Sequence, residues 1–382
     1  MNAEDLLFIA VGGAASGIAR RIVERINTPM RVLILDTDDA VLQTLTPHEG
    51  LSATIFGAKR LAGRGTGGDY RLGAGALRDD ATLVQAQIKA PRLALILTCC
   101  GGGTSGAIPT LLEMLRNQGI ATMTFATTPF AFEGSDRQQC ATIMLPSIAS
   151  ASDAIARLPL DALLGDAAGL PAEEAFSAVA KRIGAGITLF WHLLVHPGFL
   201  AFDIERFHRL LSSGVGNGLP CAFAAVSTRG ENRAEQALQH LLASPCFRPD
   251  GVDRLANASQ VIVGVLAGDD LRLLELGTLM EGLRKHCEAA QDLLLGTARE
   301  PEREGALSVV VLAFALPGAD VTEKPDALLA GLGKKHTGKK APSRASKLLV
   351  VKDRFTDVEH TLFHGQDLDV PTYQRRGIRL NR

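Results

Sequence analysis

Two short apolar runs that end in glycine-rich loops constrain the fold of this chain more than any other feature of its sequence. Residues 6–11 run into Gly12-Gly-Ala-Ala-Ser-Gly17, residues 93–98 run into Gly101-Gly-Gly-Thr-Ser-Gly106, and a helical pattern follows each loop. Two more apolar runs occupy residues 31–35 and 122–127. Short strands that alternate with helices indicate a parallel sheet covered by helices, with ligand sites beyond the carboxyl ends of the strands. We therefore predict an α/β fold with a Rossmann-like parallel sheet.

The rest of the chain predicts a long helix and a second, smaller α/β unit. The helical pattern covers about 173–195, and the later strands and helices are expected at 222–227, 261–265, 309–315, 233–243 and 271–289. Residues 334–347 hold six Lys or Arg and no acid, which is typical of a flexible linker. We predict a first α/β domain at 1–172, a central helix at 173–198, a smaller α/β domain at 199–318, and a disordered tail made of a linker at 319–366 and a terminal peptide at 367–382.

The composition excludes several classes of protein. The 382 residues include 40 Lys and Arg against 41 Asp and Glu, so the formal net charge is −1, and 46% of the residues are hydrophobic. A chain this apolar is not disordered throughout, and one this close to neutral lacks the positive field of a nucleic-acid binder, so no nucleic-acid partner is expected. The six cysteines form no C-x-x-C motif, which indicates reduced thiols in a cytoplasmic protein.

One stretch is long and apolar enough to raise the question of a membrane span. Residues 183–202 contain no Asp, Glu, Lys or Arg. They do contain His192, His196 and Pro197-Gly198, which favour a buried helix followed by a turn. The two histidines are four residues apart, but no Glu follows His192, so the zinc-protease motif is absent and no metal site is predicted.

The glycine loops carry the strongest chemical signal. Small residues between a strand and a helix let main-chain N–H groups and the positive helix end approach a phosphate. Gly101 to Gly103, followed by the hydroxyls of Thr104 and Ser105, predict a nest for two or three phosphates. A third cluster, Gly63-Arg-Gly-Thr-Gly-Gly68, could cover the distal phosphate or form a flexible surface loop. None of the three is a Walker loop, because no Gly-Lys-Ser/Thr follows.

The first loop taken alone leaves other interpretations open. The spacing Gly12-x-Ala14-x-x-Gly17, with Asp36 ending the next strand, approximates a dinucleotide-binding fingerprint and would suit a NAD-binding oxidoreductase. The same residues would also suit a tight strand-to-helix turn that binds nothing. The NAD interpretation leaves Gly101 to Gly106 and Phe132-Glu-Gly134 without a role.

Several short motifs, in the same order along the chain, resemble those of the FtsZ family of the tubulin superfamily. Residues 101–106 resemble its GGGTGTG loop with one residue deleted, and residues 127–137 (TTPFAFEGSDR) are similar to its T-K-P-F-x-F-E-G-x-x-R segment. Shorter matches are Asp36-Thr-Asp38 to N-T-D, Pro159-Leu-Asp161 to P-N-D, and Gly230-Glu-Asn-Arg-Ala-Glu235 to G-x-D-R-A-x-x-A. The resemblance covers residues 6–317 and a further patch at the C-terminus.

This resemblance implies a nucleotide-binding domain at 1–172 and head-to-tail polymerisation, in which a loop of one subunit completes the nucleotide site of the next. GTP would be the ligand, with Mg²⁺ as the accompanying ion. The residues that would line the site are Gly12, Gly13, Ser16, Gly17, Asp38, Gly65, Thr66, Gly67, Gly101, Gly102, Gly103, Thr104, Ser105, Gly106, Glu133, Arg137 and Phe176. For Glu133 and Arg137, an ordinary surface pair four residues apart is the alternative.

The chain departs from the family pattern in two places. The family reads guanine with an Asn and then an Asp on the central helix, where this chain has Ala180 and Lys181. The family's catalytic N-x-D-x-x-D becomes Ala201-Phe-Asp203-Ile-Glu-Arg206, so Asp203, with Glu205 as a substitute, would orient the attacking water. An alanine offers no hydrogen bond to a base, and an arginine would stabilise phosphate charge without activating water. We therefore predict weak base discrimination and slow hydrolysis.

The C-terminal segment resembles a docking peptide. Leu368-Asp-Val-Pro-Thr-Tyr-Gln-Arg-Arg376 is similar to the L-D-I-P-x-F-x-R-x peptide by which FtsZ proteins dock membrane tethers, so residues 367–376 are a candidate tether site, with an ordinary tail as the alternative. The basic residues at 334–347 would either attract anionic lipid or form a solvated linker. The expected location is the cytoplasm, at the inner face of the membrane.

Taken together, these observations predict an FtsZ-like GTP-binding protein that assembles into cytoskeletal filaments and serves cell division or membrane remodelling. A non-hydrolysing structural filament or an adaptor pseudoenzyme is the alternative from another class. The NAD-binding oxidoreductase is the third.

Overall fold

The computed structural model describes residues 2–24, 30–214, 218–248, 251–315, 362–363 and 366–367. The chain forms two compact units, Met1–Thr322 and Glu323–Arg382. In the second unit, the described residues form two short strands, β11 (Leu362–Phe363) and β12 (Gln366–Asp367), which pair in antiparallel fashion. The predicted linker, the basic segment and the candidate tether at 367–376 otherwise lie outside the described residues.

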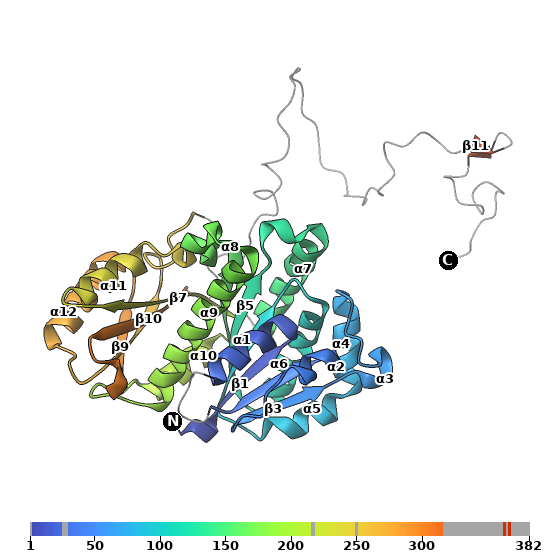
Figure 1. The fold of residues 1–382 in the computed structure, drawn as a ribbon, viewed down its shortest axis with the longest axis horizontal. Coiled ribbons are helices and arrows are strands. Elements are labelled where there is room, and N and C mark those ends of the chain that lie inside the picture. The colour runs from blue at the N-terminus through green and yellow to red at the C-terminus, as the bar shows by residue number, and fades with distance from the viewer. Residues whose placement is uncertain are drawn as a thin grey trace, which may run out of the picture. The chain divides into compact units, whose positions relative to one another are not determined.

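The first unit is built on one ten-stranded sheet with the order β3-β2-β1-β4-β5-β6-β7-β10-β8-β9 (Figure 1). Its first six strands all run parallel. They are β1 (Leu6–Val11), β2 (Val32–Asp36), β3 (Leu51–Ile55), β4 (Leu93–Cys99), β5 (Ala121–Thr128) and β6 (Ala154–Pro159). The predicted α/β class with a parallel sheet is therefore confirmed.

The last four strands continue the same sheet with mixed directions. They are β7 (Leu219–Arg229), β8 (Gln260–Ala267), β9 (Asp292–Arg299) and β10 (Ala306–Phe314). Strand β10 is antiparallel to both β7 and β8, whereas β9 is parallel to β8. The two halves join where β7 pairs with β6 over three positions, Ala154–Leu219, Ile155–Pro220 and Ala156–Cys221. The smaller α/β domain predicted from the sequence thus continues the parallel part of the same sheet. The predicted domain boundaries at 172 and 198 stay a prediction.

Helices cover both faces of the sheet because alternate strand residues enter different cores. Leu6 and Phe8 of β1 pack in a core with α1 and α9, whereas Leu7 and Ile9 pack in a second core with helices α4 to α7. A third core joins β8 and β10 to α11 and α12. The helices are α1 (Gly13–Val23), α2 (Asp39–Gln43), α3 (Ala58–Leu61), α4 (Tyr70–Asp79), α5 (Ala81–Ile88), α6 (Ile108–Asn117), α7 (Ser135–Ala151), α8 (Leu160–Leu164), α9 (Ala172–Val195), α10 (Ile204–Ser213), α11 (Arg233–Leu242) and α12 (Leu273–His286).

Helix α9 is the predicted central helix, and Figure 1 shows it between the two halves of the sheet. By length and composition it could cross a membrane, but 61% of its most apolar window is buried inside the protein. Trp191, Phe190 and Ile187 on this helix are fully buried. The helix ends before Pro197, which forms an isolated bridge with Ala298 of β9. These contacts fit the predicted core helix followed by a turn.

Candidate functional site

The three glycine clusters lie together at one end of the parallel strands, which we call the glycine-loop edge (residues 12–17, 63–68 and 101–106). A Cβ atom at Gly12 would lie 3.4 Å from the Cβ of Thr104, and one at Gly103 would lie 2.5 Å from Oγ1 of Thr66. The hydroxyls of Thr37, after β2, and Thr104, after β4, are 3.5 Å apart. The edge therefore joins loops from four parts of the sequence.

Several of these glycines are required by close main-chain packing. A Cβ at Gly106 would overlap the carbonyl oxygen of Tyr70, and one at Gly73 in α4 would overlap that of Gly103. Gly12, Gly65 and Gly67 have φ values of +92°, +70° and +58°, which other residues rarely adopt. The third cluster is packed against the second through Thr66, while Arg64, Gly67 and Gly68 are exposed, so both interpretations of this cluster stay open.

Gly102 differs from its neighbours, because nothing in the fold demands a glycine there. The residue is exposed, its φ is −103°, and the atom nearest to an added Cβ would be the carbonyl oxygen of Cys99 at 3.8 Å. Its exposed main chain lies between Gly101 and Gly103. The absence of a side chain at this position leaves main-chain atoms accessible to a ligand.

Asp36 and Asp38 follow β2 but differ in accessibility. Asp36 is buried, and its Oδ1 accepts hydrogen bonds from the main-chain N–H groups of Thr37 (2.7 Å) and Asp38 (3.2 Å). Burial raises the pKa of the Asp36 carboxyl, although these hydrogen bonds oppose the shift. Its Oδ2 has no hydrogen-bond partner within the described ranges. Asp38 forms an isolated bridge with Arg64 of the third cluster, so it lies at the glycine-loop edge.

Glu133 and Arg137 lie next to the second loop. A Cβ at Gly101 would lie 3.4 Å from the Cβ of Arg137. The guanidinium of Arg137 donates to Glu133 over 2.6 Å, and the other oxygen of Glu133 accepts from the main-chain N–H of Phe130 over 2.9 Å. The ion pair between Glu133 and Arg137 that the alternative interpretation predicts is therefore present. It lies beside the glycine loops.

Phe176 belongs to a small cluster of aromatic rings. Its ring meets that of Phe130 edge-on, with 5.0 Å between the centroids, and that of Phe132 at 6.2 Å. Phe130 is buried, but the other two rings are partly exposed. Because Phe130 is also bound to Glu133, this cluster connects the start of α9 with the glycine-loop edge.

The two residues of α9 that differ from the family pattern, Ala180 and Lys181, lie one turn beyond Phe176. Ala180 is half-buried and Lys181 is exposed. Both line a cavity of about 860 Å³ along α9, together with Arg21 of α1. Arg21 donates a hydrogen bond of 2.8 Å to the hydroxyl of Ser177, a contact between α1 and α9 that the sequence reasoning missed. Arg21 and Ser177 are 156 positions apart in the sequence, and no sequence motif contains both.

A second hollow, of about 350 Å³, adjoins the first glycine loop. It is lined by Gly13, Ser16 and Gly17 on one side and by α2 on the other. The hydroxyl of Ser16 donates to the carbonyl of Gly12 over 2.9 Å, so this side chain is engaged in the turn. Within the described ranges, no group of three His, Cys, Asp or Glu residues is placed to hold a metal ion.

The predicted catalytic residues lie elsewhere, at what we call the α10 edge (Asp203, Glu205 and Arg206). Asp203 caps α10 by accepting the main-chain N–H of Arg206 over 2.9 Å. Glu205 forms a 2.9 Å ion pair with Arg92, and this partner lowers the pKa of Glu205. Arg206 pairs with Asp292. Asp203, Glu205 and Arg206 are thus each already bonded to another group of the same chain.

The two edges are separated by the length of a strand. Arg92 directly precedes β4, whereas Gly101 lies just beyond its other end. Seven residues of extended chain span about 20 Å. The structure therefore brings Asp203 and Glu205 together with each other, but not with the glycine loops of the same chain.

Comparisons with known proteins place both halves of the chain in one family. A family model described as "Tubulin/FtsZ family, GTPase domain" matches residues 6–167, and one described as "FtsZ family, C-terminal domain" matches residues 222–316. Cell division protein FtsZ 1 of Pyrococcus horikoshii is 25% identical over 82% of this chain and 82% of its own length. FtsZ of Buchnera aphidicola (Acyrthosiphon pisum) is 26% identical over 80% of this chain and 77% of its own.

Solved structures show the same fold. An empty FtsZ dimer from M. jannaschii has a TM-score of 0.73 at 20% identity and covers 84% of this chain and 94% of that one. A GTPγS-bound protofilament of CetZ2 from Haloferax volcanii has a TM-score of 0.66 at 20% identity, covering 83% and 95%. The two family models divide the chain between the glycine-loop half and the mixed half of the sheet, and together they match well over half of its residues. The chain belongs to the tubulin/FtsZ family.

Proposed function

We propose that this protein binds GTP at the glycine-loop edge and assembles head to tail into filaments that hydrolyse GTP slowly. One observation carries the proposal. The loops suited to phosphate and the carboxylates suited to water activation occupy edges about 20 Å apart on the same sheet.

The glycine-loop edge suits a triphosphate because its accessible groups are main-chain amides and hydroxyls. Gly12, Gly13 and Gly17 of the first loop, Gly65 to Gly67 with Asp38, and Gly101 to Gly106 would surround the phosphates. Arg137 would approach phosphate oxygens, for which its planar fork is suited, and Phe176 would contact the base. Mg²⁺ would accompany the triphosphate, held chiefly by its oxygens.

Head-to-tail assembly follows from the separation of the two edges. The α10 edge of one subunit can approach GTP only when it lies against the glycine-loop edge of a neighbour. Such a contact joins two different surfaces, so it repeats along an open filament. The solved relatives include one described as a dimer and one described as a protofilament, which supports self-association.

Slow hydrolysis is proposed because the α10 edge has few groups available for water. Asp203 keeps one oxygen engaged in the helix cap, and Glu205 is held by Arg92. Arg206 brings a cation to the position where the family has a carboxylate, and a cation cannot accept a proton from water.

The cellular role that we propose is that of a cytoplasmic cytoskeletal protein in cell division or membrane remodelling. The curated relatives are named as cell division proteins, which supports the first of these roles. A tether through residues 367–376 would bring the filament to the inner membrane face.

The decisive experiment identifies the nucleotide released by acid from the purified protein and images the same sample by electron microscopy. Bound guanine nucleotide, together with filaments that form on addition of GTP, is the expected result. A protein that carries no nucleotide and does not assemble with GTP at saturating Mg²⁺ would contradict the proposal.

A non-hydrolysing structural filament or adaptor remains the second candidate, favoured by the engaged side chains at the α10 edge. It predicts assembly that is indifferent to GTP, GDP or the absence of nucleotide. The NAD interpretation is opposed by one contact pattern: the Asp36 carboxylate is buried and hydrogen-bonded to its own loop, whereas a ribose-binding carboxylate must be accessible.

A further inference from the structure

The carboxyl group of Asp36 lies beneath the glycine-loop edge, where the proposed function places a triphosphate. Its Oδ1 accepts the main-chain N–H groups of Thr37 and Asp38, which fixes the orientation of the carboxyl group. Its Oδ2 faces the start of α1, because a Cβ added to Gly13 would lie 3.7 Å from it. Only 2% of Asp36 is exposed, and Oδ2 has no hydrogen-bond partner among the described residues. A buried polar atom without a partner requires an explanation.

The segment that carries Asp36 contacts all three glycine clusters. Gly13 belongs to the first cluster, and the hydroxyl of Thr37 lies 3.5 Å from that of Thr104 in the second. The carbonyl of Thr37 accepts the N–H of Gly65, in the third cluster, over 3.1 Å. A negative charge on Asp36 would therefore act on any anion that these loops hold.

The surroundings of the Asp36 carboxyl offer little to balance such a charge. The residues around this segment on the neighbouring elements are neutral: Gly13 of α1, Val41 of α2, Thr104 after β4 and Gly65 in the third cluster. The charged neighbours are the half-buried Asp38 and the exposed Asp39 and Arg64. Burial raises the pKa of the Asp36 carboxyl in the free protein, and the charge of Asp38 raises it further. Ionisation of Asp36 is thus already disfavoured before a ligand binds.

A bound triphosphate would oppose that ionisation more strongly. The positive N-terminal end of α1 favours one nearby anion, and in the proposed complex the phosphates occupy that position. A carboxylate beside the same helix end would then face several negative charges in a water-poor setting. Like charges at this range favour the neutral form of the acid.

The family pattern points to the same form of the side chain. The family's N-T-D motif has an Asn where this chain has Asp36. A protonated Asp has nearly the shape of an Asn, and each offers one oxygen as an acceptor and a second group as a hydrogen-bond donor. An ionised Asp has neither the donor nor the neutral charge. The neutral acid therefore reproduces the chemistry of the amide at this position.

We propose that Asp36 takes up one proton from solvent when GTP binds and holds it on Oδ2, so that the triphosphate lies above a neutral acid. The inference rests on the proposed GTP site. Oδ1 keeps its two main-chain hydrogen bonds, and the added proton turns the unpartnered oxygen into a donor. Because the complex holds one more proton than the free protein, GTP affinity falls as the pH rises.

Calorimetric titration of the full-length protein with GTP tests this inference at saturating Mg²⁺. The titration is made at about pH 8, where the phosphates of GTP are already ionised, since phosphate monoesters have a second pKa of about 6. Two buffers with different ionisation enthalpies give the number of protons taken up per GTP bound. The dissociation constant is then measured at about pH 7.5 and about pH 8.5, on either side of this value.

The test variant is Asp36→Asn, which keeps the size of the side chain and its acceptor oxygen. Asp153→Asn is the matched control. Asp153 is also a buried carboxyl whose pKa is raised by burial, but it binds Thr122 near the start of β5, at the opposite end of the sheet. If Asp36→Asn does not fold, Asp36→Ser takes its place, because a serine hydroxyl can accept the same main-chain N–H groups.

We expect the wild type and Asp153→Asn to take up about one proton per GTP more than Asp36→Asn does. Between the two pH values, the dissociation constant of the wild type should rise about tenfold, while that of Asp36→Asn changes less than about twofold. At the higher pH, Asp36→Asn should therefore bind GTP more tightly than the wild type, an outcome that the loss of a merely structural contact would not produce.

Three outcomes separate this inference from the proposed function. A wild type that binds no GTP at any pH refutes the function itself. GTP binding with the same proton count in the wild type and Asp36→Asn overturns the inference alone. An Asp36→Asn variant that binds GTP more weakly at every pH, with no difference in proton count, would also overturn it, since Asp36 would then act as a charged ligand for Mg²⁺.

Discussion

The glycine-loop edge and the α10 edge present different kinds of chemical group to a ligand. At the first, the accessible groups are main-chain amides, which remain in place whatever the neighbouring side chains are. At the second, the groups are the side chains of Asp203, Glu205 and Arg206, each already paired within the chain. Phosphate binding through the main chain can therefore survive sequence change that removes base reading and water activation, both of which depend on single side chains.

The largest effect on ligand binding is expected at Gly106. Gly106→Ala would place a methyl group on the carbonyl oxygen of Tyr70, so the second loop would have to move. We expect GTP affinity to fall at least about 100-fold, or about 2.7 kcal/mol. Gly277→Ala, whose methyl group enters open space on α12, is the control. An affinity within threefold of the wild type would contradict the assignment of this loop.

Gly102→Ala separates binding from folding at the same loop. The added methyl group has room in the fold, so the melting temperature should not change. On the exposed side of the loop the methyl group would meet a phosphate, and GTP affinity should fall about tenfold. Calorimetric titration beside thermal melting measures both quantities. If affinity is unchanged while the fold is intact, the phosphates bind elsewhere.

Helix α9 lies between the glycine-loop edge and the α10 edge. We expect its His192 to make the free energy of unfolding depend on pH. Burial lowers the pKa of His192 from its ordinary 6.5 to about 4, although the charge of Glu300 opposes the shift. Below pH 6.5 the unfolded chain binds more protons, so stability is complete above pH 6.5 and is lost as the pH falls towards 4. The loss attributable to this residue is about 3 kcal/mol.

Urea denaturation between pH 4 and pH 7 measures that dependence. His192→Gln should flatten the curve in this window, whereas His48→Gln, on an exposed turn, should leave it as it is. An identical pH dependence in His192→Gln and the wild type would rule out a buried neutral imidazole at this position.

The α10 edge can be tested by restoring a carboxylate. Arg206→Asp combined with Asp292→Asn replaces the cation and removes the acid that would repel the new carboxylate. GTP turnover should rise at least about tenfold, since a placed general base contributes that much or more. Phosphate release at saturating GTP is the measurement, with Asp292→Asn alone as the control. Turnover that stays at the level of the control would show that water activation does not occur at this edge.

The smallest effect concerns the base. ITP lacks the 2-amino group of GTP, and Ala180 offers no acceptor for that group, so the two affinities should agree within about fivefold. Ala180→Asn with Lys181→Asp should increase the preference for GTP. Competition binding against a fluorescent GTP analogue measures the ratio. A wild-type preference well beyond tenfold would mean that other residues read guanine.

Much of the fold was predictable because its strands are buried on both faces. The continuous apolar runs at 6–11, 93–98 and 309–315 needed no tertiary information, and they overlap β1, β4 and β10. The strands β3, β6 and β9 were missed. β3 is mostly half-buried with a mixed pattern, Arg157 interrupts β6, and β9 begins with four half-buried residues. Such sequences are typical of several local structures.

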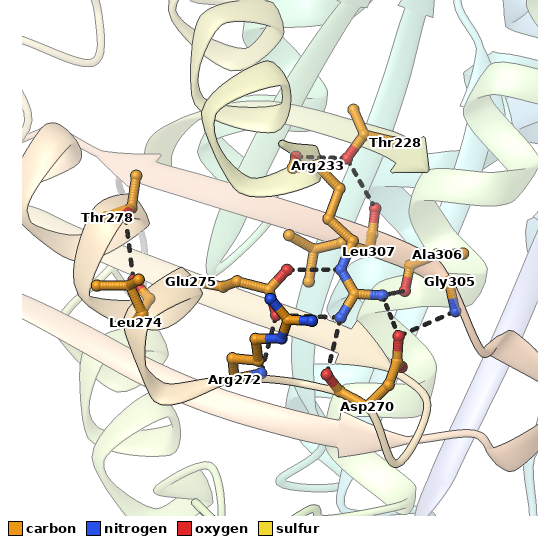
Figure 2. Close-up of polar contacts among 10 residues, drawn as sticks. All are labelled: Thr228, Arg233, Asp270, Arg272, Leu274, Glu275, Thr278, Gly305, Ala306 and Leu307. Atoms are coloured by element: carbon orange, nitrogen blue, oxygen red, sulfur yellow. Dashed lines mark hydrogen bonds and ion pairs between the residues drawn. The ribbon is translucent and has the colours of Figure 1, made fainter. Parts of the chain in front are cut away.

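The candidate site divides in the same way. The glycine loops were predictable, since they are continuous in sequence and their composition is rare. The pairing of Glu205 with Arg92 and the contacts of Arg233 with Asp270 and Glu275 (Figure 2) were not, because they join residues 113 and 37 to 42 positions apart, and each alone is an ordinary charged residue. Only the completed fold brings such partners together.

The short ladder between β6 and β7 has a mechanical consequence. Three paired positions join the halves of the sheet there, and one of them is Pro220, which lacks an N–H group, whereas β7 and β10 pair over nine. Tension pulling the halves apart would load this seam before any longer ladder. In the proposed filament, each protomer would therefore be most compliant along this seam, and the filament could curve without unfolding.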